Sequence, residues 1–124
     1  MKINHVIWDW NGTLVNDADL CVEIVNELLV EFDQEPVSTK FYLDNFEFPV
    51  KKYYNKIGLP TTQNSYDYIS NNFINSYRER YIRCLLQTDA LKCISKLFSL
   101  NITQSVLSAG MQSDLDTFIK HFRS

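Results

Sequence analysis

Two short apolar runs near the ends of the chain have the character of strands. Val6-Ile7-Trp8 is partly β-branched, ends at Asp9 and is followed by Gly12, which predicts a buried strand closing into a tight turn. The segment 102–107 predicts a second strand, and it ends at Ser108-Ala109-Gly110. Both predicted strands therefore end in residues that are common where a chain turns.

The chain between these runs has helical spacing. Leu20, Ile24, Leu28 and Phe32 recur every four residues, which predicts an amphipathic helix that Asn16 or Asp17 caps. We expect Glu35-Pro36 to stop this helix after about residue 33, and Gly58 to end a later one. The predicted helices cover about 17–33, 38–45, 49–58 with Pro49 in the first turn, 63–84, a segment beginning at Asp89, and a last segment with Leu115, Phe118, Ile119 and Phe122 on one face.

This order predicts an α/β fold with an inserted helical unit. About 70 residues of helical pattern lie between the two strands, which is far more than one crossover between parallel strands requires. A helical insertion over a parallel α/β core explains the pattern best. We expect residues 1–15 and 85–124 to form the core, with two parallel strands recognisable, and residues 16–84 to form the insertion.

Composition narrows the class of protein. The 124 residues carry a net charge of −3, with 22% charged and 14% aromatic residues, which argues against disorder and against a nucleic-acid partner. No apolar run approaches the roughly 18 residues of a membrane span, and no signal sequence is evident, so we expect a cytoplasmic protein. Cys21, Cys84 and Cys93 match no metal-binding spacing, and we expect each to be a small buried hydrophobe.

The end of the first predicted strand carries the candidate chemistry. Asp9 would lie at the carboxyl edge of a parallel sheet, where open α/β folds bind ligands. Gly12 would let the backbone turn sharply so that its N–H faces a phosphate, and Thr13 adds a hydroxyl. The alternative is that Asp9 caps a turn and that Asn11-Gly12 is an ordinary turn dipeptide.

Residues 6–17 resemble the first signature of haloacid-dehalogenase-superfamily phosphatases. That signature is a hydrophobic strand followed by Asp-x-Asp-Gly-Thr-Leu, and here it is spelled Asp9-Trp10-Asn11-Gly12-Thr13-Leu14. This spelling, together with residues 46–54, resembles a phosphoglycolate-phosphatase-like branch with a helical cap. The resemblance implies a partial Rossmann-like core, with residues 16–84 as the cap.

The resemblance also implies roles for individual residues. Asp9 would attack phosphorus and form an aspartyl-phosphate, with Mg²⁺ held by the Asp9 carboxylate and the backbone carbonyl of Asn11. Ser108, at the end of the second strand as in the family's second signature, would hold the phosphoryl group with the N–H of Ala109. Gly12 and Thr13 would complete the phosphate site.

Two departures from the family pattern bear on activity. Position 11 is Asn instead of the Asp that exchanges protons in the family, so we expect slow hydrolysis of poor leaving groups. The chain ends at Ser124, before the family's later Lys and acidic signatures, so we expect a C-terminally truncated chain with impaired turnover. We also expect the first strand to keep an exposed edge through which the chain self-associates.

The implied substrate is a small phosphorylated metabolite that the residues do not identify. The loop 45–49 would reach over the site, with Phe48 and Lys51 near the substrate, although both also suit cap packing and a solvated surface. His5 and His121 are assigned to structure. Two alternatives stay open: a non-catalytic binding or assembly module, and a plain nucleotide-binding domain, which the absence of a glycine-rich phosphate motif disfavours.

Overall fold

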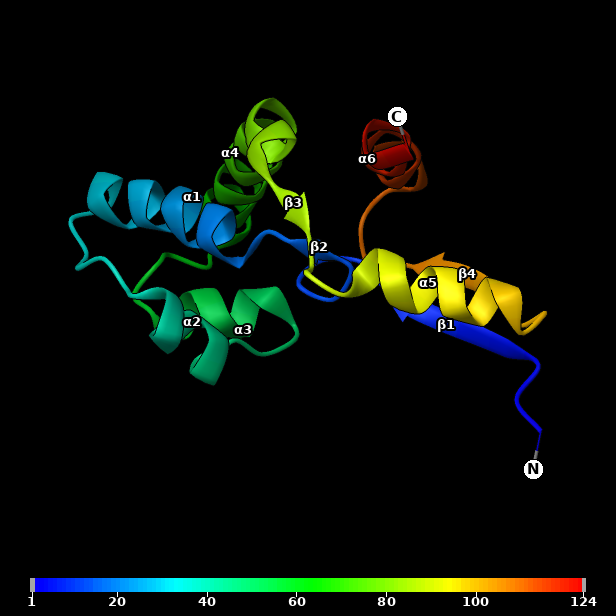
Figure 1. Cartoon of the computed structure of the whole chain (residues 1–124). Helices are drawn as coiled ribbons and strands as arrows, with labels where there is room; N and C mark the ends of the chain where they lie inside the picture. Colours follow the sequence, from blue (N-terminus) through cyan, green and yellow to red (C-terminus); the bar gives the residue numbers. More distant parts are fainter. Residues whose placement is uncertain (1, 124) are drawn as a thin grey trace. The chain divides into compact units, whose positions relative to one another are not determined.

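The computed structural model describes residues 2–123 (Figure 1). The chain folds into two compact units. One unit contains Met1–Asp17 and Ile82–Ser124, and the other contains Ala18–Tyr81. The chain leaves the first unit after Asp17, builds the second, and returns at Ile82. The predicted α/β class with inserted helices is confirmed, while the functional names core and cap stay predictions.

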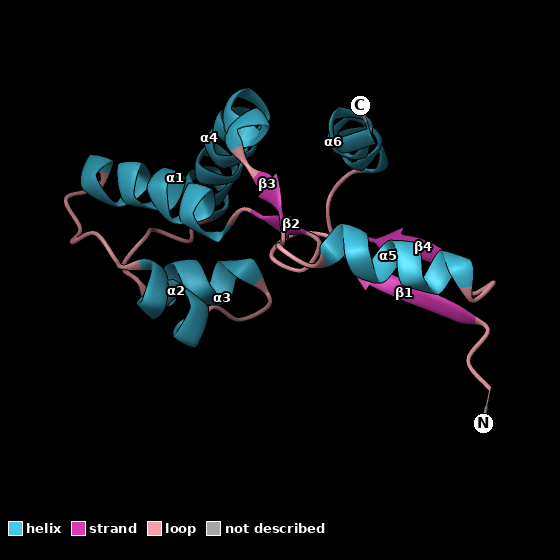
Figure 2. Ribbon diagram, viewed as in Figure 1, coloured by secondary structure: helices cyan, strands magenta, loops and turns pink. Residues whose placement is uncertain are grey.

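The first unit contains a two-stranded parallel sheet. β1 (His5–Asp9) and β4 (Thr103–Leu107) pair in register, with His5 opposite Thr103 and Asp9 opposite Leu107. Both predicted strands are present, and both end at the same edge of the sheet, but the prediction that the first is buried was wrong, because every residue of β1 is exposed or half-buried. α5 (Ala90–Ser99) precedes β4, and α6 (Gln112–Arg123) follows it (Figure 2).

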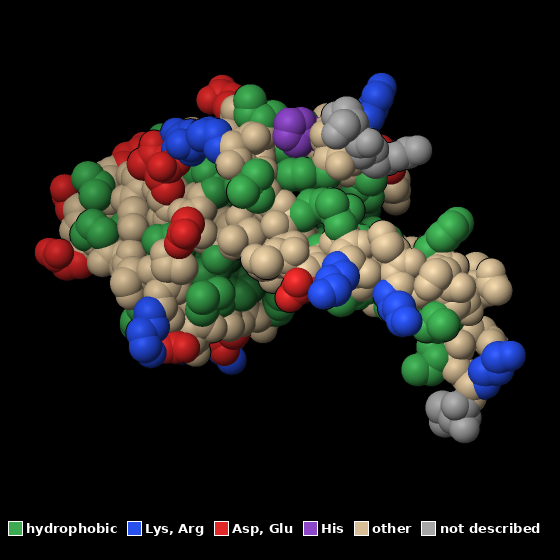
Figure 3. Space-filling view, viewed as in Figure 1, with side chains coloured by type: hydrophobic (Ala, Val, Ile, Leu, Met, Phe, Trp, Pro, Cys, Tyr) green, Lys and Arg blue, Asp and Glu red, His purple; other side chains and the backbone are tan. Residues whose placement is uncertain are grey.

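The two faces of this sheet differ in what covers them. On one face α5 packs through a chain of hydrogen bonds: Trp8 Nε1 donates to Gln104 Oε1 at 2.8 Å, and Gln104 Nε2 donates to the Ile94 carbonyl at 3.1 Å. On the other face Ile7 is 64% exposed and Leu107 is 68% exposed. Hydrophobic side chains accordingly reach the surface in this part of the chain (Figure 3).

A second pair of strands was not predicted. β2 (Val15–Asn16) and β3 (Leu85–Leu86) form a short antiparallel ladder in which Val15 lies opposite Leu86 and Asn16 opposite Leu85. Two residues are too few to show the alternation that identifies a strand, and the pairing joins positions about 70 residues apart. The ladder lies where the chain leaves and re-enters the first unit.

The second unit is helical, and its first helix supplies most of its core. α1 (Ala18–Glu31) buries a stripe of apolar residues at helical spacing, as predicted; these are Leu20, Cys21, Val22, Ile24, Val25, Leu28 and Leu29. α2 (Thr39–Asn45), α3 (Val50–Lys56) and α4 (Gln63–Arg80) complete the unit. Burying each large apolar side chain contributes about 1.5–3 kcal/mol relative to leaving it exposed.

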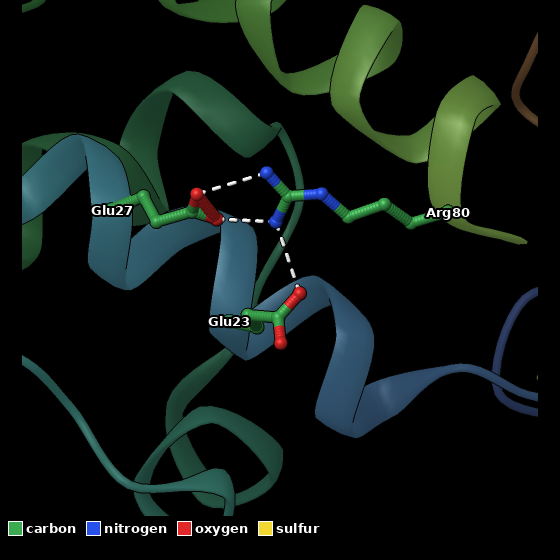
Figure 4. A network of polar contacts seen from close by, with 3 residues as sticks. All are labelled: Glu23, Glu27 and Arg80. Atoms are coloured by element: carbon green, nitrogen blue, oxygen red, sulfur yellow. Dashed lines mark hydrogen bonds and ion pairs between the residues drawn. The ribbon is translucent and has the colours of Figure 1, made fainter. Parts of the chain in front are cut away.

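Polar contacts tie α4 to α1 within this unit. Arg80 Nη1 lies 2.9 Å from Glu23 Oε2, and Arg80 Nη2 donates to Glu27 Oε1 at 2.9 Å, while its Nη1 also contacts the second Glu27 oxygen (Figure 4). The two glutamates are four residues apart and therefore lie on one face of α1. One guanidinium thus bridges two turns of α1.

Three predicted helix ends differ from the structure by a few residues, for local reasons. α1 ends before Glu35-Pro36, because Asp33 takes a left-handed conformation with φ 57° and Gln34 N–H bonds back to the Leu29 carbonyl at 2.7 Å, as in a Schellman motif. α4 ends at Arg80 and continues as a 3₁₀ turn over Tyr81–Arg83 instead of running to residue 84. Pro49 caps α3 rather than occupying its first turn, whereas Gly58, at φ 96°, follows its end as predicted.

The cysteine prediction was correct for two of the three residues. Cys21 and Cys84 are buried, but Cys93, on α5, is exposed, as is most of that helix. Over residues 2–123, no helix combines the length and the apolar character that crossing a membrane requires.

Candidate active site

Asp9 lies at the carboxyl end of β1 with its side chain exposed. Its Oδ1 accepts a hydrogen bond from the backbone N–H of Trp10 at 2.8 Å. Its Oδ2 lies 3.5 Å from Thr13 Oγ1, at the outer limit of hydrogen bonding. One carboxylate oxygen is therefore fixed by the backbone, and the other has only a weak contact with Thr13.

The turn after Asp9 is held by its own backbone. The Trp10 carbonyl accepts from the N–H groups of Thr13, Leu14 and Val15 at 3.2, 3.0 and 3.2 Å. Gly12 has φ 75°, and its N–H donates to the Val15 carbonyl at 3.0 Å. In this structure the Gly12 N–H is engaged within the turn rather than presented outward. A Cβ at Gly12 would meet no atom within 4 Å, so glycine is favoured there by backbone conformation alone.

Trp10 anchors the turn to the first unit. Its side chain is buried, and its ring lies edge-on to Phe122 of α6 with centroids 5.8 Å apart. The neighbouring side chains Asp9 and Asn11 are exposed, as is Thr13. The turn therefore buries its aromatic residue and presents its polar side chains on the outside.

Ser108 follows β4 at the same edge of the sheet. Leu107 pairs with Asp9, so Ser108 directly follows the residue opposite the candidate nucleophile. Its Oγ accepts from the Gly110 N–H at 3.1 Å, which leaves the hydroxyl hydrogen available for donation to another group. Ala109 is exposed in the bend that follows. The register thus places the two predicted strand-end sites on adjacent strands.

Two residues that the sequence did not single out for the site hold the turn from outside. Asn11 Nδ2 donates to Asp17 Oδ2 at 2.7 Å, and Asp17 is only 2% exposed. Gln87, just after β3, donates from Nε2 to the Gly12 carbonyl at 3.0 Å and from its backbone N–H to the Leu14 carbonyl at 2.8 Å. Asp17 was expected only as a helix cap, and nothing in the local sequence marks Gln87.

The surroundings of Asp17 also affect a neighbouring thiol. Burial raises the pKa of Cys84, and the charge of Asp17 raises it further, while Arg83 lowers it. The thiol is therefore kept in its neutral form, which suits a packed side chain and not a nucleophile.

The donor set at the turn is compatible with Mg²⁺. This ion binds through one or two carboxylates, keeps several waters and takes further oxygens from a substrate phosphate. Asp9 offers an exposed carboxylate, and Asn11 offers a backbone carbonyl two residues on. Within residues 2–123 no group of three or more His, Cys, Asp or Glu side chains could hold a metal, so these residues supply only part of a coordination shell.

The two predicted substrate residues lie in the second unit. Phe48 is 69% exposed, and its ring packs edge-on against Phe46 with centroids 5.2 Å apart. Lys51 Nζ lies 5.5 Å from the centroid of the Tyr66 ring, a cation–π distance. Both contacts belong to the surface of this unit, and a role in substrate binding stays a prediction.

Comparisons with known proteins bear on the family and the fold. A model of the family described as haloacid dehalogenase-like hydrolases matches residues 6–124. A predicted phosphatase from Clostridium acetobutylicum superposes with a TM-score of 0.80 at 14% identity, covering 98% of this chain and 56% of the other. A HAD hydrolase from Entamoeba histolytica superposes with a TM-score of 0.75 at 20% identity, covering 99% and 56%.

A predicted phosphoglycolate phosphatase from Haemophilus somnus gives a TM-score of 0.75 at 14% identity, covering 98% of this chain and 58% of the other. Identities this low show a shared fold only. The chain spans somewhat more than half the length of these solved structures. No curated protein matches the sequence.

Proposed function

Because the chain belongs to the haloacid dehalogenase-like hydrolase family, we propose that it carries the nucleophile of a Mg²⁺-dependent phosphomonoesterase for a small phosphorylated metabolite. One observation carries the proposal: the register of β1 and β4 brings Asp9 and Ser108 to adjacent strand ends, with the polar turn of residues 11–13 beside them. Carboxyl edges of parallel strands are where α/β folds bind ligands.

Asp9 is the nucleophile in this proposal. Its less constrained oxygen, Oδ2, forms a bond to phosphorus while the bond between phosphorus and the leaving oxygen breaks, and the leaving oxygen keeps the electron pair. Water then attacks the aspartyl-phosphate, releasing inorganic phosphate and restoring the carboxylate. The Trp10 N–H holds Oδ1 throughout and so fixes the orientation of the carboxylate.

Other groups of the turn would hold the phosphate and the metal. The Ser108 hydroxyl and the Thr13 hydroxyl are donors suited to phosphoryl oxygens, with the Ala109 N–H as a third. The Asp9 carboxylate and the Asn11 carbonyl would hold Mg²⁺, which when bound neutralises charge so that a carboxylate can approach an anionic phosphate. A cytoplasmic location belongs to the same proposal.

A second candidate is a non-catalytic binding or assembly module. The observation that favours it is the open sheet face, where Ile7 and Leu107 are mostly exposed. The two candidates differ in whether Asp9 is required for turnover.

The test compares the unaltered chain with Asp9→Asn in the presence of Mg²⁺ and p-nitrophenyl phosphate. Asp19→Asn is the matched control, because it changes an exposed carboxylate that bonds Thr39 and lies outside the turn. We expect Asp9→Asn to fall to the rate of the buffer blank and Asp19→Asn to keep full activity. Equal rates for all three proteins would exclude Asp9 as the nucleophile and favour the assembly module.

A further inference from the structure

A buried carboxylate lies against the residue that replaces the family's proton carrier. Asp17 is only 2% exposed, whereas Asn11 is exposed, and the two side chains are joined by a 2.7 Å hydrogen bond from Nδ2 to Oδ2. Removing a carboxylate from water is costly unless it is hydrogen-bonded. The Asn11 amide is one of the groups that meet this need.

The bond fixes how the Asn11 carboxamide is turned. A carboxylate only accepts hydrogen bonds, so the amide nitrogen must face Asp17. The carbonyl oxygen of the same planar group then lies on the side away from Asp17. Short bonds to a charged acceptor are roughly twice as strong as neutral ones, so the orientation is well determined.

The backbone of the turn is held from the same region. Gln87 bonds the carbonyls of Gly12 and Leu14, and the N–H of the peptide between Asn11 and Gly12 donates to the Val15 carbonyl, so the backbone on the C-terminal side of Asn11 cannot easily rotate. Position 11 is thus restrained at its side chain by Asp17, and the backbone that follows it is restrained by the hydrogen bonds of the turn and of Gln87. A side chain fixed in this way meets the requirement for positioning a reacting group.

We propose that Asp17 is a positioning residue that holds the Asn11 carboxamide in one orientation, so that position 11 offers an oxygen acceptor and no acid to the reaction. This inference rests on the proposed function, because it assigns a role within the Asp9 reaction. It also explains why Asn suits position 11: an Asp there would place two carboxylates in hydrogen-bonding contact, which is unfavourable.

The proposal defines a substrate class. General acid catalysis typically contributes about 10²–10⁴-fold to the departure of a poor leaving group. Without an acid at position 11, the leaving oxygen departs with its electron pair and takes its proton afterwards from water. Substrates whose leaving groups are stable anions, such as aryl or acyl phosphates, are therefore favoured over alkyl phosphates.

Three variants test the pairing without any assay of activity: Asp17→Asn, Asn11→Asp, and the double variant that exchanges the two side chains. The exchange restores one carboxylate and one amide at the same positions. We expect the midpoint of urea unfolding to fall in Asn11→Asp and to return close to that of the unaltered chain in the double variant. The side-chain amide signals of Asn11 in a ¹⁵N NMR spectrum should move in Asp17→Asn and stay in place in Asp19→Asn.

The same variants test the role in the reaction. With p-nitrophenyl phosphate, Asp17→Asn should lower kcat about tenfold or more and leave KM nearly unchanged, because an amide at position 17 can both donate and accept and so no longer dictates one orientation of Asn11. In the exchanged variant the ratio of kcat for an alkyl phosphate to kcat for the aryl phosphate should rise at least tenfold, since position 11 then carries a carboxyl group.

The outcomes separate this inference from the proposed function. Additive effects of the two single changes on the unfolding midpoint, or unmoved Asn11 signals, would overturn the pairing whatever the activity. A restored midpoint with an unchanged alkyl-to-aryl ratio would overturn the positioning role. A restored midpoint in a protein whose turnover does not depend on Asp9 would instead refute the proposed function, and the catalytic role of Asp17 with it.

Discussion

The hydroxyl of Tyr53 offers a direct test of the packing in the second unit. Tyr53 is 0% exposed, and its hydroxyl has no hydrogen-bond partner within residues 2–123. Burying an unsatisfied polar group costs about 1–3 kcal/mol, which Tyr53→Phe would remove while keeping the ring. The ring itself packs 5.8 Å from Tyr42 and 5.2 Å from Phe46, centroid to centroid, and these contacts do not involve the hydroxyl.

The free-energy cost of the small cavity that the missing hydroxyl leaves is low. The vacated space is on the order of 10 Å³, which at about 24 cal/mol per Å³ costs only about 0.2 kcal/mol. We therefore expect Tyr53→Phe to stabilise the chain by about 1–2 kcal/mol, which shifts the urea midpoint upward by roughly 0.5–1 M for a slope near 2 kcal/mol per M.

The measurement is equilibrium unfolding in urea, followed by circular dichroism. Tyr68→Phe is the matched control, because it removes the same atom from an exposed tyrosine whose hydroxyl bonds Glu31. The control should show little change or a slight loss. If Tyr53→Phe lowers the midpoint instead, the hydroxyl is satisfied in solution, for example by a buried water, and the reasoning is refuted.

Three further predictions concern charge and exposure. Burial raises the pKa of the Tyr53 and Tyr54 phenols above the ordinary value of 10.0, so at high pH the folded chain retains protons that the unfolded chain releases. The free energy of unfolding should therefore be unaffected below about pH 10 and should fall at higher pH. Unfolding midpoints measured at pH 8 and about pH 11 test this, and equal midpoints would contradict it. Arg80→Met should lower the thermal midpoint at low salt by breaking the contacts to α1, and the difference should shrink in about 1 M NaCl; a difference independent of salt would point to lost packing instead. The open sheet face and edge of β1 predict self-association, so Ile7→Lys should lower the molecular mass measured by analytical ultracentrifugation at high protein concentration. If the unaltered chain is itself monomeric at that concentration, the prediction is wrong.

The sequence predicted those parts of the fold that depend on local pattern. The four-residue spacing in α1 and the apolar runs of β1 and β4 each concern residues within one element, where side-chain periodicity follows backbone geometry. The end of α1 lies two residues before the predicted one, because the left-handed turn at Asp33 stops the helix ahead of the more obvious signal at Pro36. The strands β2 and β3 were missed because only their long-range pairing makes them strands.

The candidate site shows the same division. Asp9, Gly12 and Ser108 were singled out because each ends or follows an apolar run, and the strand register brings Asp9 opposite Leu107, the residue before Ser108, while their roles stay predictions. Asp17 and Gln87 act on the turn through contacts that span 6 and 75 residues, and neither contact leaves a local trace. The sequence also could not show which backbone N–H groups of the turn face outward, because this depends on the hydrogen bonds within the turn, and one of these engages the Gly12 N–H.

The ladder between β2 and β3 allows the second unit to be replaced in the sequence without changing the path of the first unit. Asn16 and Leu85 are direct partners across two antiparallel strands, so the chain departs and returns at neighbouring points. Antiparallel strands in that arrangement are the ends of a hairpin that a turn of about two residues can close. The second unit, Ala18–Tyr81, can therefore be lengthened, exchanged or excised with little change in the closure entropy of the remainder, which lets new helices be grafted onto the same turn and sheet while Asp17 is kept.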